Sequence, residues 1–228
     1  MAESKAYVIK SIERTGDVKV FKLFPEDGKP IAFLPGQFVN LYKLDEKTLT
    51  RAYSVASPPE WPYIELAIQI IGGKFTSYVD TLKANDRIGV MGPFGANGYG
   101  GETKAIMVAG GIGITPIMGI IRHIAAKRIK GDFRLYYFCG RMDGAPYVSE
   151  LMSYNSAGII KADLRFTKDQ CTPFGSSRVD INKAMEEAGG FKDYSYYLCG
   201  PVAMVKSFSD AIVAKGVDRK KIKSDAFG

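Results

Sequence analysis

The chain has 228 residues, of which 46% are hydrophobic and 24% charged, and these proportions are typical of a globular protein of one or two domains. No apolar run approaches the roughly 20 residues that span a bilayer, and the first residues lack the order of a signal peptide, so we expect a cytoplasmic protein without membrane insertion. The net charge of +7 favours acidic partners. Nucleic acid is disfavoured as a partner, because no basic segment is interleaved with aromatic residues.

The first hundred residues show a mostly two-residue hydrophobic period, which predicts β-strands. In the clearest run, Ile and Leu alternate with Glu65, Ala67 and Gln69, the pattern of a half-buried antiparallel strand. Strands are predicted at 6–14, 18–24, 37–44, 49–56, 64–70 and 87–91, with a short helix at 75–82. This order predicts a six-stranded antiparallel Greek-key β-barrel over residues 1–100.

From residue 101 to residue 228 the pattern alternates between strand and helix. The predicted strands are 105–109, 133–139, 162–167, 194–199 and 221–227. The predicted helices are 116–127, 148–154, 181–188 with caps at Asp180 and Gly189, and 202–214. Alternating units of this kind predict an α/β domain with a five-stranded parallel sheet covered on both faces.

Two glycine-rich turns are candidate phosphate sites. In VAGGIGITPIMG, residues 108–119, a strand ends in glycines and a helix begins near Pro116. Glycines allow the backbone to approach a phosphate, and a helix N-terminus attracts an anion. The turn GGKFTSYV, residues 72–79, enters the short helix of the first domain in the same way. One such turn on each domain indicates two nucleotides that meet between the domains.

The segments YYFCGR (136–141) and YYLCGP (196–201) both end a predicted strand. Cys139 and Cys199 would therefore lie at the carboxyl edge of the sheet, where open α/β sheets bind ligands. The alternative is that each is a small buried hydrophobe before a turn glycine. With Cys171 these are the three cysteines, and no CxxC pair is present, so any redox cofactor would be organic and no metal site is expected. We interpret the single histidine, His123, as a packing or surface residue.

The segment RAYS, residues 51–54, lies on a predicted strand. A regular strand does not aim consecutive side chains at one point, so a ligand that contacts Arg51, Tyr53 and Ser54 must run along the backbone.

Seven motifs in order resemble those of the ferredoxin–NADP reductase superfamily, most of all the bacterial ferredoxin/flavodoxin NADP reductases, with flavin reductases as near relatives. They are PGQF (35–38), RAYS (51–54), GKFTS (73–77), GPFG (92–95), GGIGITP (110–116), CGP (199–201) and AFG (226–228). The resemblance covers nearly the whole chain. It implies a flavin on the barrel and a nicotinamide dinucleotide on the second domain.

The resemblance implies FAD, although members that bind FMN exist. Arg51 would bind the pyrophosphate bidentately, Tyr53 would stack on the isoalloxazine, and Ser54 would hydrogen-bond near flavin N5. The other implied FAD-binding residues are Ala52, Leu66, Ala67, Ile68, Gln69, Gly73, Lys74, Phe75, Thr76 and Ser77.

On the second domain the resemblance implies NADPH or NADH. The implied binding residues are Gly111, Gly113, Thr115, Pro116, Arg141, Thr167, Lys168, Arg178, Cys199 and Gly200. Lys168 stands where family members that prefer NADPH carry Arg; it keeps the charge but loses the bidentate fork. We favour NADPH and leave NADH open. In the family's usual strand order the strands of Cys139 and Cys199 flank a third, which places them about 9–10 Å apart and excludes a disulfide.

The implied catalytic residues are Ser54, Tyr53, Cys199, Asp225 and Phe227. Phe227 would lie on the flavin ring and is thus also a cofactor-binding residue. Its side chain would have to move away before the nicotinamide could stack on the flavin. Asp225 stands where many relatives carry Glu, and its shorter side chain makes it a weaker candidate for proton relay than Ser54.

The implied activity is an NAD(P)H oxidoreductase reaction that moves hydride to flavin N5 and passes single electrons to a separate acidic carrier such as ferredoxin or flavodoxin. Three alternatives stay open: a flavin reductase that treats flavin as a substrate, the reductase component of an oxygenase, and a non-catalytic flavin electron-transfer subunit. The oligomeric state cannot be deduced from the sequence.

Overall fold

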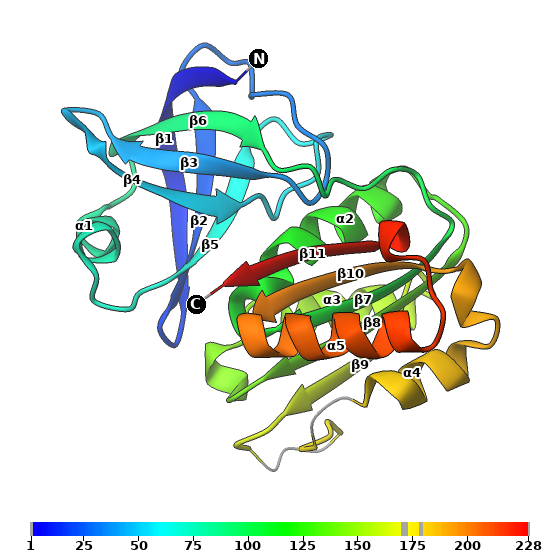
Figure 1. Cartoon of the computed structure of the whole chain (residues 1–228). Helices are drawn as coiled ribbons and strands as arrows, with labels where there is room; N and C mark the ends of the chain where they lie inside the picture. The colour runs from blue at the N-terminus through cyan, green and yellow to red at the C-terminus, as the bar shows by residue number, and fades with distance from the viewer. Residues whose placement is uncertain (1, 170–172, 178–179, 228) are drawn as a thin grey trace.

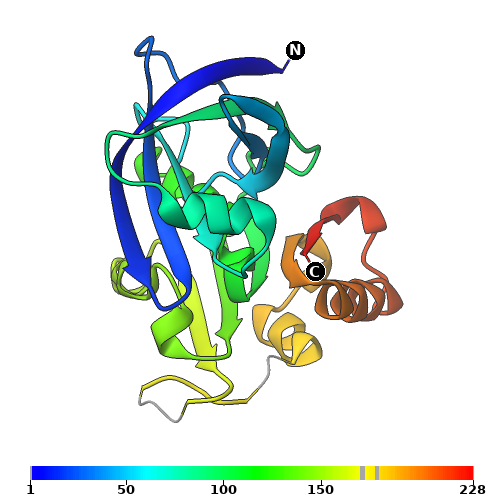
Figure 2. The same ribbon diagram turned by 90° about the vertical axis from the view of Figure 1, so that its left-hand side faces the viewer.

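The first half of the chain forms an antiparallel sheet that curves into a barrel (Figure 1). The computed structural model describes residues 2–169, 173–177 and 180–227. The strands are β1 (Glu3–Thr15), β2 (Val18–Pro25), β3 (Phe38–Lys43), β4 (Glu46–Ser54), β5 (Ile64–Gln69) and β6 (Arg87–Phe94), in the order β4-β3-β6-β1-β2-β5. The helix α1 (Lys74–Thr81) connects β5 with β6. Figure 2 shows α1 lying across the side of the barrel that faces the viewer.

A seam separates β4 from β5, which are the two edge strands of this sheet. Just past β4, the amide of Ala56 donates to the carbonyl of Glu65 at 2.8 Å and joins the two edges at one end. Over the rest of their described length β4 and β5 are not paired with each other. Edge strands present unpaired N–H and C=O groups. The seam is therefore a surface along which a ligand can contact consecutive backbone positions.

The second half forms a five-stranded parallel sheet in the order β11-β10-β7-β8-β9. Its strands are β7 (Lys104–Gly110), β8 (Asp132–Cys139), β9 (Lys161–Phe166), β10 (Ser195–Pro201) and β11 (Ile222–Phe227). Its helices are α2 (Ile114–Ala126), α3 (Val148–Ser156), α4 (Ile181–Ala188) and α5 (Val202–Ala214), with short 3-10 turns η1 (Gly111–Gly113), η2 (Met142–Gly144), η3 (Phe191–Asp193) and η4 (Arg219–Lys221). Figure 1 shows α4 and α5 on one face of the sheet and α2 and α3 on the other.

Side-chain alternation along β7 explains why helices cover both faces. Ala105 and Met107 pack into one buried core with residues of α2 and α3, whereas Ile106 and Val108 pack into another with residues of α4 and α5. All four side chains are buried. A continuous apolar strand of this kind is typical of a parallel sheet between two helical layers. The predicted two-domain architecture is confirmed, with strand and helix ends within a few residues of those expected.

The prediction that β5 is half-buried is wrong. On its polar face Glu65 is 2% exposed and Ala67 is 3% exposed, and only Gln69 at the end of the strand is exposed. The cover comes from the second domain, where Arg122 of α2 donates to the Glu65 carboxylate at 2.6 Å. Alternation shows that a strand has two different faces, but it does not show what packs against the polar one.

The predicted placement of Cys139 and Cys199 is confirmed. β8 and β10 flank β7, and both cysteines are free thiols at the carboxyl ends of their strands. Cys171 lies outside the described residues. His123 lies 3.0 Å from the Glu60 carboxylate and edge-on to the ring of Tyr99, as a packing residue does. Within the described ranges, no cluster of metal-ligating side chains occurs and no helix is long and apolar enough to cross a membrane.

Asp132, at the start of β8, bonds to its own strand, to the first residue of β9 and to the residue that precedes β10, at the amino edge of the parallel sheet. Its carboxylate accepts hydrogen bonds from Arg134 at 3.0 Å, from Lys161 at 3.0 Å and from Tyr194 at 2.6 Å. Burial alone would raise the pKa of Asp132, but these hydrogen bonds outweigh burial and lower it to about 2.

The lowered pKa gives a pH-dependent contribution to stability. The carboxyl group of an unfolded Asp has a pKa of about 3.9. The stabilisation of the folded state by Asp132 is therefore complete above about pH 4 and is lost as the pH falls towards about 2. We expect Asp132→Asn to unfold at lower urea concentration than the wild type near neutral pH, and the difference to shrink through this acidic range. A difference that stays constant down to the acid limit of folding would contradict the assignment.

Candidate functional site

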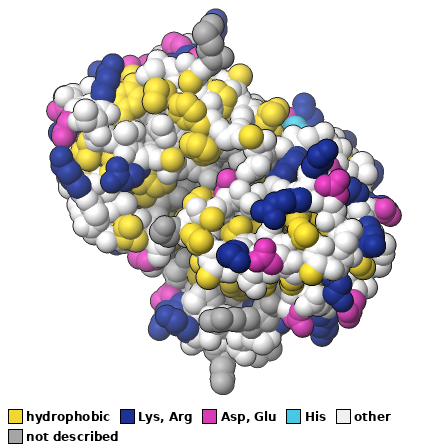
Figure 3. Space-filling model, in the orientation of Figure 1, with side chains coloured by type: hydrophobic (Ala, Val, Ile, Leu, Met, Phe, Trp, Pro, Cys, Tyr) yellow, Lys and Arg dark blue, Asp and Glu magenta, His cyan; other side chains and the backbone are white. Residues whose placement is uncertain are grey.

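A cleft of about 600 Å³ lies at the junction of the two domains. Its volume falls within the roughly 300–1,000 Å³ that small-molecule sites occupy. Figure 3 shows hydrophobic side chains on both sides of the groove between the two lobes. The barrel lines the cleft with Arg51, Ala52, Tyr53, Ser54, Ala67, Gln69, Ile71, Gly73, Lys74, Phe75 and Thr76. The second domain lines it with Gly110, Gly111, Ile112, Thr115, Gly200, Pro201 and Phe227.

The last four residues of β4 form one wall of the cleft. Among the described residues the Ser54 hydroxyl has no hydrogen-bond partner, and the Arg51 guanidinium donates only to the carbonyl of Thr50, at 2.8 Å. Burial raises the pKa of Tyr53 to about 12 against the opposing effect of Arg51, so its hydroxyl is neutral near physiological pH. The wall therefore offers a cation, a neutral aromatic ring and a free hydroxyl in four consecutive residues.

The start of α1 lies next to this wall. Gly73 occupies the N-cap position, no side chain caps the helix, and no acidic residue lies in its first turn. The Thr76 hydroxyl donates to the carbonyl of Gly73 at 3.1 Å. The Lys74 ammonium lies 3.1 Å from the Glu46 carboxylate. Uncapped amides and the positive end of the helix dipole suit an anion at this position.

The turn between β7 and α2 forms the opposite wall. Gly111 has φ of +54°, and nothing lies within 4 Å of the position that a Cβ would take, so the space above it is open to a ligand. At Gly113 a Cβ would lie 2.2 Å from the carbonyl oxygen of Cys199, so this glycine packs against β10 and does not line the cleft. Thr115 does line it, and its hydroxyl donates to the carbonyl of Ile112 at 2.8 Å.

A second cleft of about 640 Å³ lies on the α/β domain and continues from the first. The two share Gly110, Gly111 and Pro201. The other residues of the second cleft are Phe138, Cys139, Gly140, Thr167, Ala203, Met204, Ser207 and Phe208. Ligands in the two clefts would therefore meet at the end of β7.

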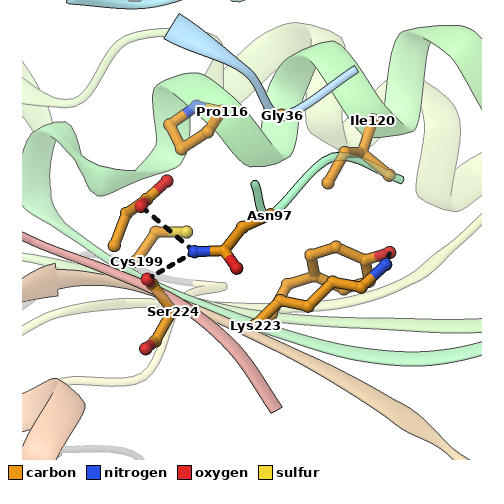
Figure 4. Close-up of a pocket in the computed structure, with 9 residues that line it drawn as sticks. Gly36, Asn97, Pro116, Ile120, Cys199, Lys223 and Ser224 are labelled. Atoms are coloured by element: carbon orange, nitrogen blue, oxygen red, sulfur yellow. Dashed lines mark hydrogen bonds between the residues drawn. The ribbon is translucent and has the colours of Figure 1, made fainter. Parts of the chain in front are cut away.

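A small cavity of about 10 Å³ lies behind the first cleft, which is about the space of a single water molecule. Figure 4 shows Asn97 pointing toward β11, where its amide donates to the Ser224 carbonyl at 2.9 Å and to the Asp225 carboxylate at 3.5 Å. Asp225 and Cys199 line this inner cavity and not the first cleft. Burial raises the pKa of the Cys199 thiol, and it raises the pKa of Asp225 although Asn97 opposes the shift.

Three residues predicted to bind FAD do not line the cleft. Leu66 and Ile68 are fully buried in the barrel core, because they share the inward face of β5. Ser77 is exposed on α1 outside the cleft. Only Ala67 and Gln69, on the other face of β5, reach the cleft.

The residues predicted to bind the dinucleotide divide in a similar way. Pro116 lines the inner cavity. Arg141 is exposed and pairs with Asp143 at 3.3 Å, and the Lys168 amide donates to the carbonyl of Gly140, which places Lys168 at the rim of the second cleft. Arg178 lies outside the described residues.

The contribution of α5 was not predicted from the sequence, nor was that of four lining residues on other segments. The missed lining residues are Ile71, Ile112, Phe138, Pro201, Ala203, Met204, Ser207 and Phe208. The available signal was position: α5 starts directly after β10, and helix starts at the carboxyl edge of a parallel sheet face the ligand crevice.

The residues present fit an FAD and a nicotinamide dinucleotide. Each wall of the first cleft contains a helix start without a capping side chain or an acidic first turn, which suits phosphates. Tyr53 offers a neutral ring for stacking, and Gly111 leaves room for close approach of a ligand to the backbone.

Comparison with known families agrees with this geometry. Residues 5–99 match the model of the oxidoreductase FAD-binding domain, and residues 107–210 match the model of the oxidoreductase NAD-binding domain. The two matches together cover most of the chain, which therefore belongs to the oxidoreductases that join an FAD-binding domain to an NAD-binding domain. Its fold is also that of a ferredoxin-NADP⁺ reductase from Plasmodium falciparum, with a TM-score of 0.79 at 19% identity. These matches confirm the family resemblance and the cofactors FAD and NAD(P)H that were predicted from the sequence.

Individual relatives are distant. The chain is 26% identical to the glycine betaine monooxygenase reductase subunit of Pseudomonas aeruginosa over 96% of its length and 63% of that protein. It is 21% identical to flavohemoprotein A of Dictyostelium discoideum over 99% of its length and 61% of that protein. The chain thus spans about six-tenths of these curated relatives. Its fold matches the FAD/NAD-binding domain of nitric oxide dioxygenase from Vibrio cholerae with a TM-score of 0.88, 18% identity and 98% of both chains covered.

Proposed function

We propose that this chain takes hydride from NADPH or NADH and passes single electrons to a separate protein acceptor, with an FAD domain over residues 1–100 and a nucleotide domain over residues 101–228. Bound FAD would supply the conversion between the two-electron donor and the one-electron acceptor. The observation that carries the proposal is that the two clefts share Gly110, Gly111 and Pro201. Hydride transfer requires direct contact of donor and acceptor, which this overlap provides.

The barrel residues would each hold one part of the flavin. Arg51 and the start of α1, with Lys74, would bind the phosphates. Tyr53 would stack on the ring, and the free hydroxyl of Ser54 would hydrogen-bond at the reacting edge. The unpaired edge of β4 would contact the chain of the cofactor along its length.

The second domain would hold the dinucleotide across the turn between β7 and α2. Gly111 and Thr115 would contact the pyrophosphate and the nicotinamide side, and Gly200 would line the nicotinamide slot. Lys168, with Arg141 nearby, would attract the 2′-phosphate of NADPH. We therefore favour NADPH as donor, with NADH as the alternative.

The proposed acceptor is an acidic electron carrier such as ferredoxin or flavodoxin. The two densest basic runs, residues 127–130 and 219–223, do not line the first cleft. Lys127 is at the end of α2, and only the first turn of that helix lines the cleft. Arg219–Lys221 precede β11, which reaches the cleft only at its last residues. Among the described residues that line the first cleft only Arg51 and Lys74 are basic, and both would already pair with the phosphates of FAD. This predicts a weaker salt dependence of partner binding than the total charge suggests.

The reductase component of an oxygenase is the second candidate. Relatives over more than nine-tenths of this chain include the glycine betaine monooxygenase reductase subunit and a terephthalate 1,2-dioxygenase reductase component of Comamonas sp. In that case the acceptor would be an oxygenase or a cluster-bearing domain rather than a free carrier.

Anaerobic titration with NADPH and with NADH tests the proposed function. We expect purified protein to keep its yellow colour through gel filtration and to bleach with about one equivalent of the preferred donor. Colourless protein that reduces added FMN would identify a flavin reductase instead. Bound flavin that neither donor bleaches would identify a non-catalytic electron-transfer subunit.

Phe227 is expected to compete with the nicotinamide. It lines the first cleft at the end of β11 and is 37% exposed. Aromatic stacking contributes about 0.5–1.5 kcal/mol, so Phe227→Ala should tighten dinucleotide binding roughly 2- to 10-fold. Equilibrium titration of the oxidised protein with NADP⁺ and NAD⁺ measures this. Unchanged affinity for both dinucleotides would show that Phe227 does not compete with the nicotinamide.

A further inference from the structure

Arg122 of α2 is almost completely buried and bonds to both domains at once. Its side chain is 4% exposed. One nitrogen, Nη1, donates to the Glu65 carboxylate at 2.6 Å and to the Ala56 carbonyl at 3.0 Å, and both acceptors belong to the barrel. Nε and Nη2 donate to the Glu150 carboxylate of α3 at 2.8 and 2.6 Å, in the bidentate geometry of a strong ion pair.

The aromatic contacts of the guanidinium repeat this division. Its carbon lies 4.8 Å from the ring centre of Trp61, which belongs to the barrel, and 4.8 Å from that of Tyr147, which belongs to the α/β domain. The Tyr147 hydroxyl is buried without a hydrogen-bond partner among the described residues. Arg122, Glu65, Glu150, Trp61 and Tyr147 are called the Arg122 clamp below.

The helix that carries Arg122 also packs closely on the barrel. A Cβ at Gly119 would lie 2.6 Å from the carbonyl oxygen of Val55, so only glycine allows this approach. Thr115, Gly119 and Arg122 are four and three residues apart, which places them on one face of α2. This face runs from the first cleft at Thr115 to the clamp at Arg122.

The clamp is continuous with both walls of the first cleft. On the barrel side, Glu65 shares one face of β5 with Ala67 and Gln69, which line the cleft. On the other side, Thr115 lines the cleft two helical turns before Arg122. A change in the clamp is therefore expected to change the separation of the two walls.

We propose that Arg122 is a positioning residue that fixes the distance between the flavin and nicotinamide sites by bonding the barrel to the helix that begins at the dinucleotide turn. The inference depends on the proposed function for its kinetic consequence, but its structural part does not. A displacement of about 1 Å between reacting groups can slow a reaction by up to about 10²-fold. The clamp should thus act on the rate of hydride transfer more than on the binding of either ligand.

The test compares Arg122→Met with Arg134→Met. Arg134 is a matched control, because it is also largely buried and ion-paired, but its partner Asp132 lies in its own domain. Hydrogen exchange of the cofactor-free protein should show at least tenfold faster exchange over residues 55–65 in Arg122→Met and no change there in Arg134→Met. In the FAD-loaded protein at saturating NAD(P)H, flavin reduction should slow at least tenfold in Arg122→Met alone, with retention of FAD unchanged.

Arg122→Lys separates geometry from charge. A lysine keeps the charge but has no planar fork to bond two carboxylates from two domains. We expect Arg122→Lys to reduce its flavin nearly as slowly as Arg122→Met. Flavin reduction at the wild-type rate in Arg122→Lys would overturn the proposal that the planar guanidinium joins the two domains. If Arg122→Met does not fold, Glu65→Gln keeps the side-chain shape but removes one carboxylate from the buried guanidinium. It should change exchange and rate in the same direction by at least about tenfold.

Three results would overturn the proposal: rates within twofold of the wild type in Arg122→Met, equal slowing in Arg134→Met, or loss of FAD without a change in the rate of the loaded fraction. Failure of the proposed function is distinguishable. If neither dinucleotide reduces the wild-type flavin, the function is wrong, and the exchange over residues 55–65 still decides whether the clamp joins the domains.

Discussion

Replacement of Gly113 by alanine is expected to lower the free energy of unfolding by about 3 kcal/mol, at the upper end of the range for overpacking. A Cβ at this position would lie 2.2 Å from the carbonyl oxygen of Cys199 and 2.8 Å from the Cα of Gly200. These are backbone atoms of a central strand and cannot rotate away. The added methyl group must therefore push η1 away from β10. This shift also moves the wall of the first cleft, because Gly200 of β10 lines that cleft.

Gly111→Ala is the matched control for this prediction. Gly111 has φ of +54°, but nothing lies within 4 Å of its Cβ position, so alanine adds backbone strain without a clash. We expect a loss of about 1–2 kcal/mol. Urea unfolding with a common m-value measures both variants. A larger loss for Gly111→Ala than for Gly113→Ala would show that the packing of η1 on β10 is not the limiting contact.

Replacement of Ser54 by alanine is expected to slow the reduction of bound flavin by about 10²-fold while leaving FAD retention unchanged. The Ser54 hydroxyl lines the cleft and has no partner within the described residues, so it is available to the reacting edge of the ligand. Loss of a single well-placed donor at a centre of developing charge typically costs about 10²–10³ in rate. Stopped-flow absorbance of the flavin under saturating donor measures the effect.

Ser11→Ala is the control for Ser54→Ala, because Ser11 lies on β1 and lines neither cleft. It should reduce its flavin at the wild-type rate. Equal rates in Ser54→Ala and the wild type would exclude Ser54 from the reaction. A loss of FAD in Ser54→Ala, without a change in rate, would make Ser54 a binding residue only.

Local patterns predicted the elements of this fold well, because each element is specified by residues close in sequence. The two-residue period predicted β5, and Asp180 caps α4 through the amides of Asn182 and Lys183 as its position predicts. The glycine turn of residues 108–119 lies at the cleft as expected.

The errors have two sources, a local alternation that was not applied and contacts between distant segments. The expected contact of Leu66 and Ile68 with FAD ignored the alternation that had itself predicted the strand; their side chains point into the barrel core. The partner of Glu65 is Arg122, 57 residues away, and no pattern in the sequence around either residue predicts that ion pair. Cys199 and Asp225 lie at the expected strand ends. That both are buried behind the first cleft depends on Asn97 and on the backbone of other segments, which the strand pattern does not specify.

The open seam of the barrel has a consequence for the protein before it acquires FAD. β4 and β5 are both edge strands, and Ile71, just past β5, is 74% exposed beside them. Unpaired strand edges next to exposed apolar side chains are templates for β-pairing between chains. A bound flavin would cover these edges. The supply of flavin during synthesis would then decide how much of the chain stays monodisperse and how much is lost to aggregation, before any electron is transferred.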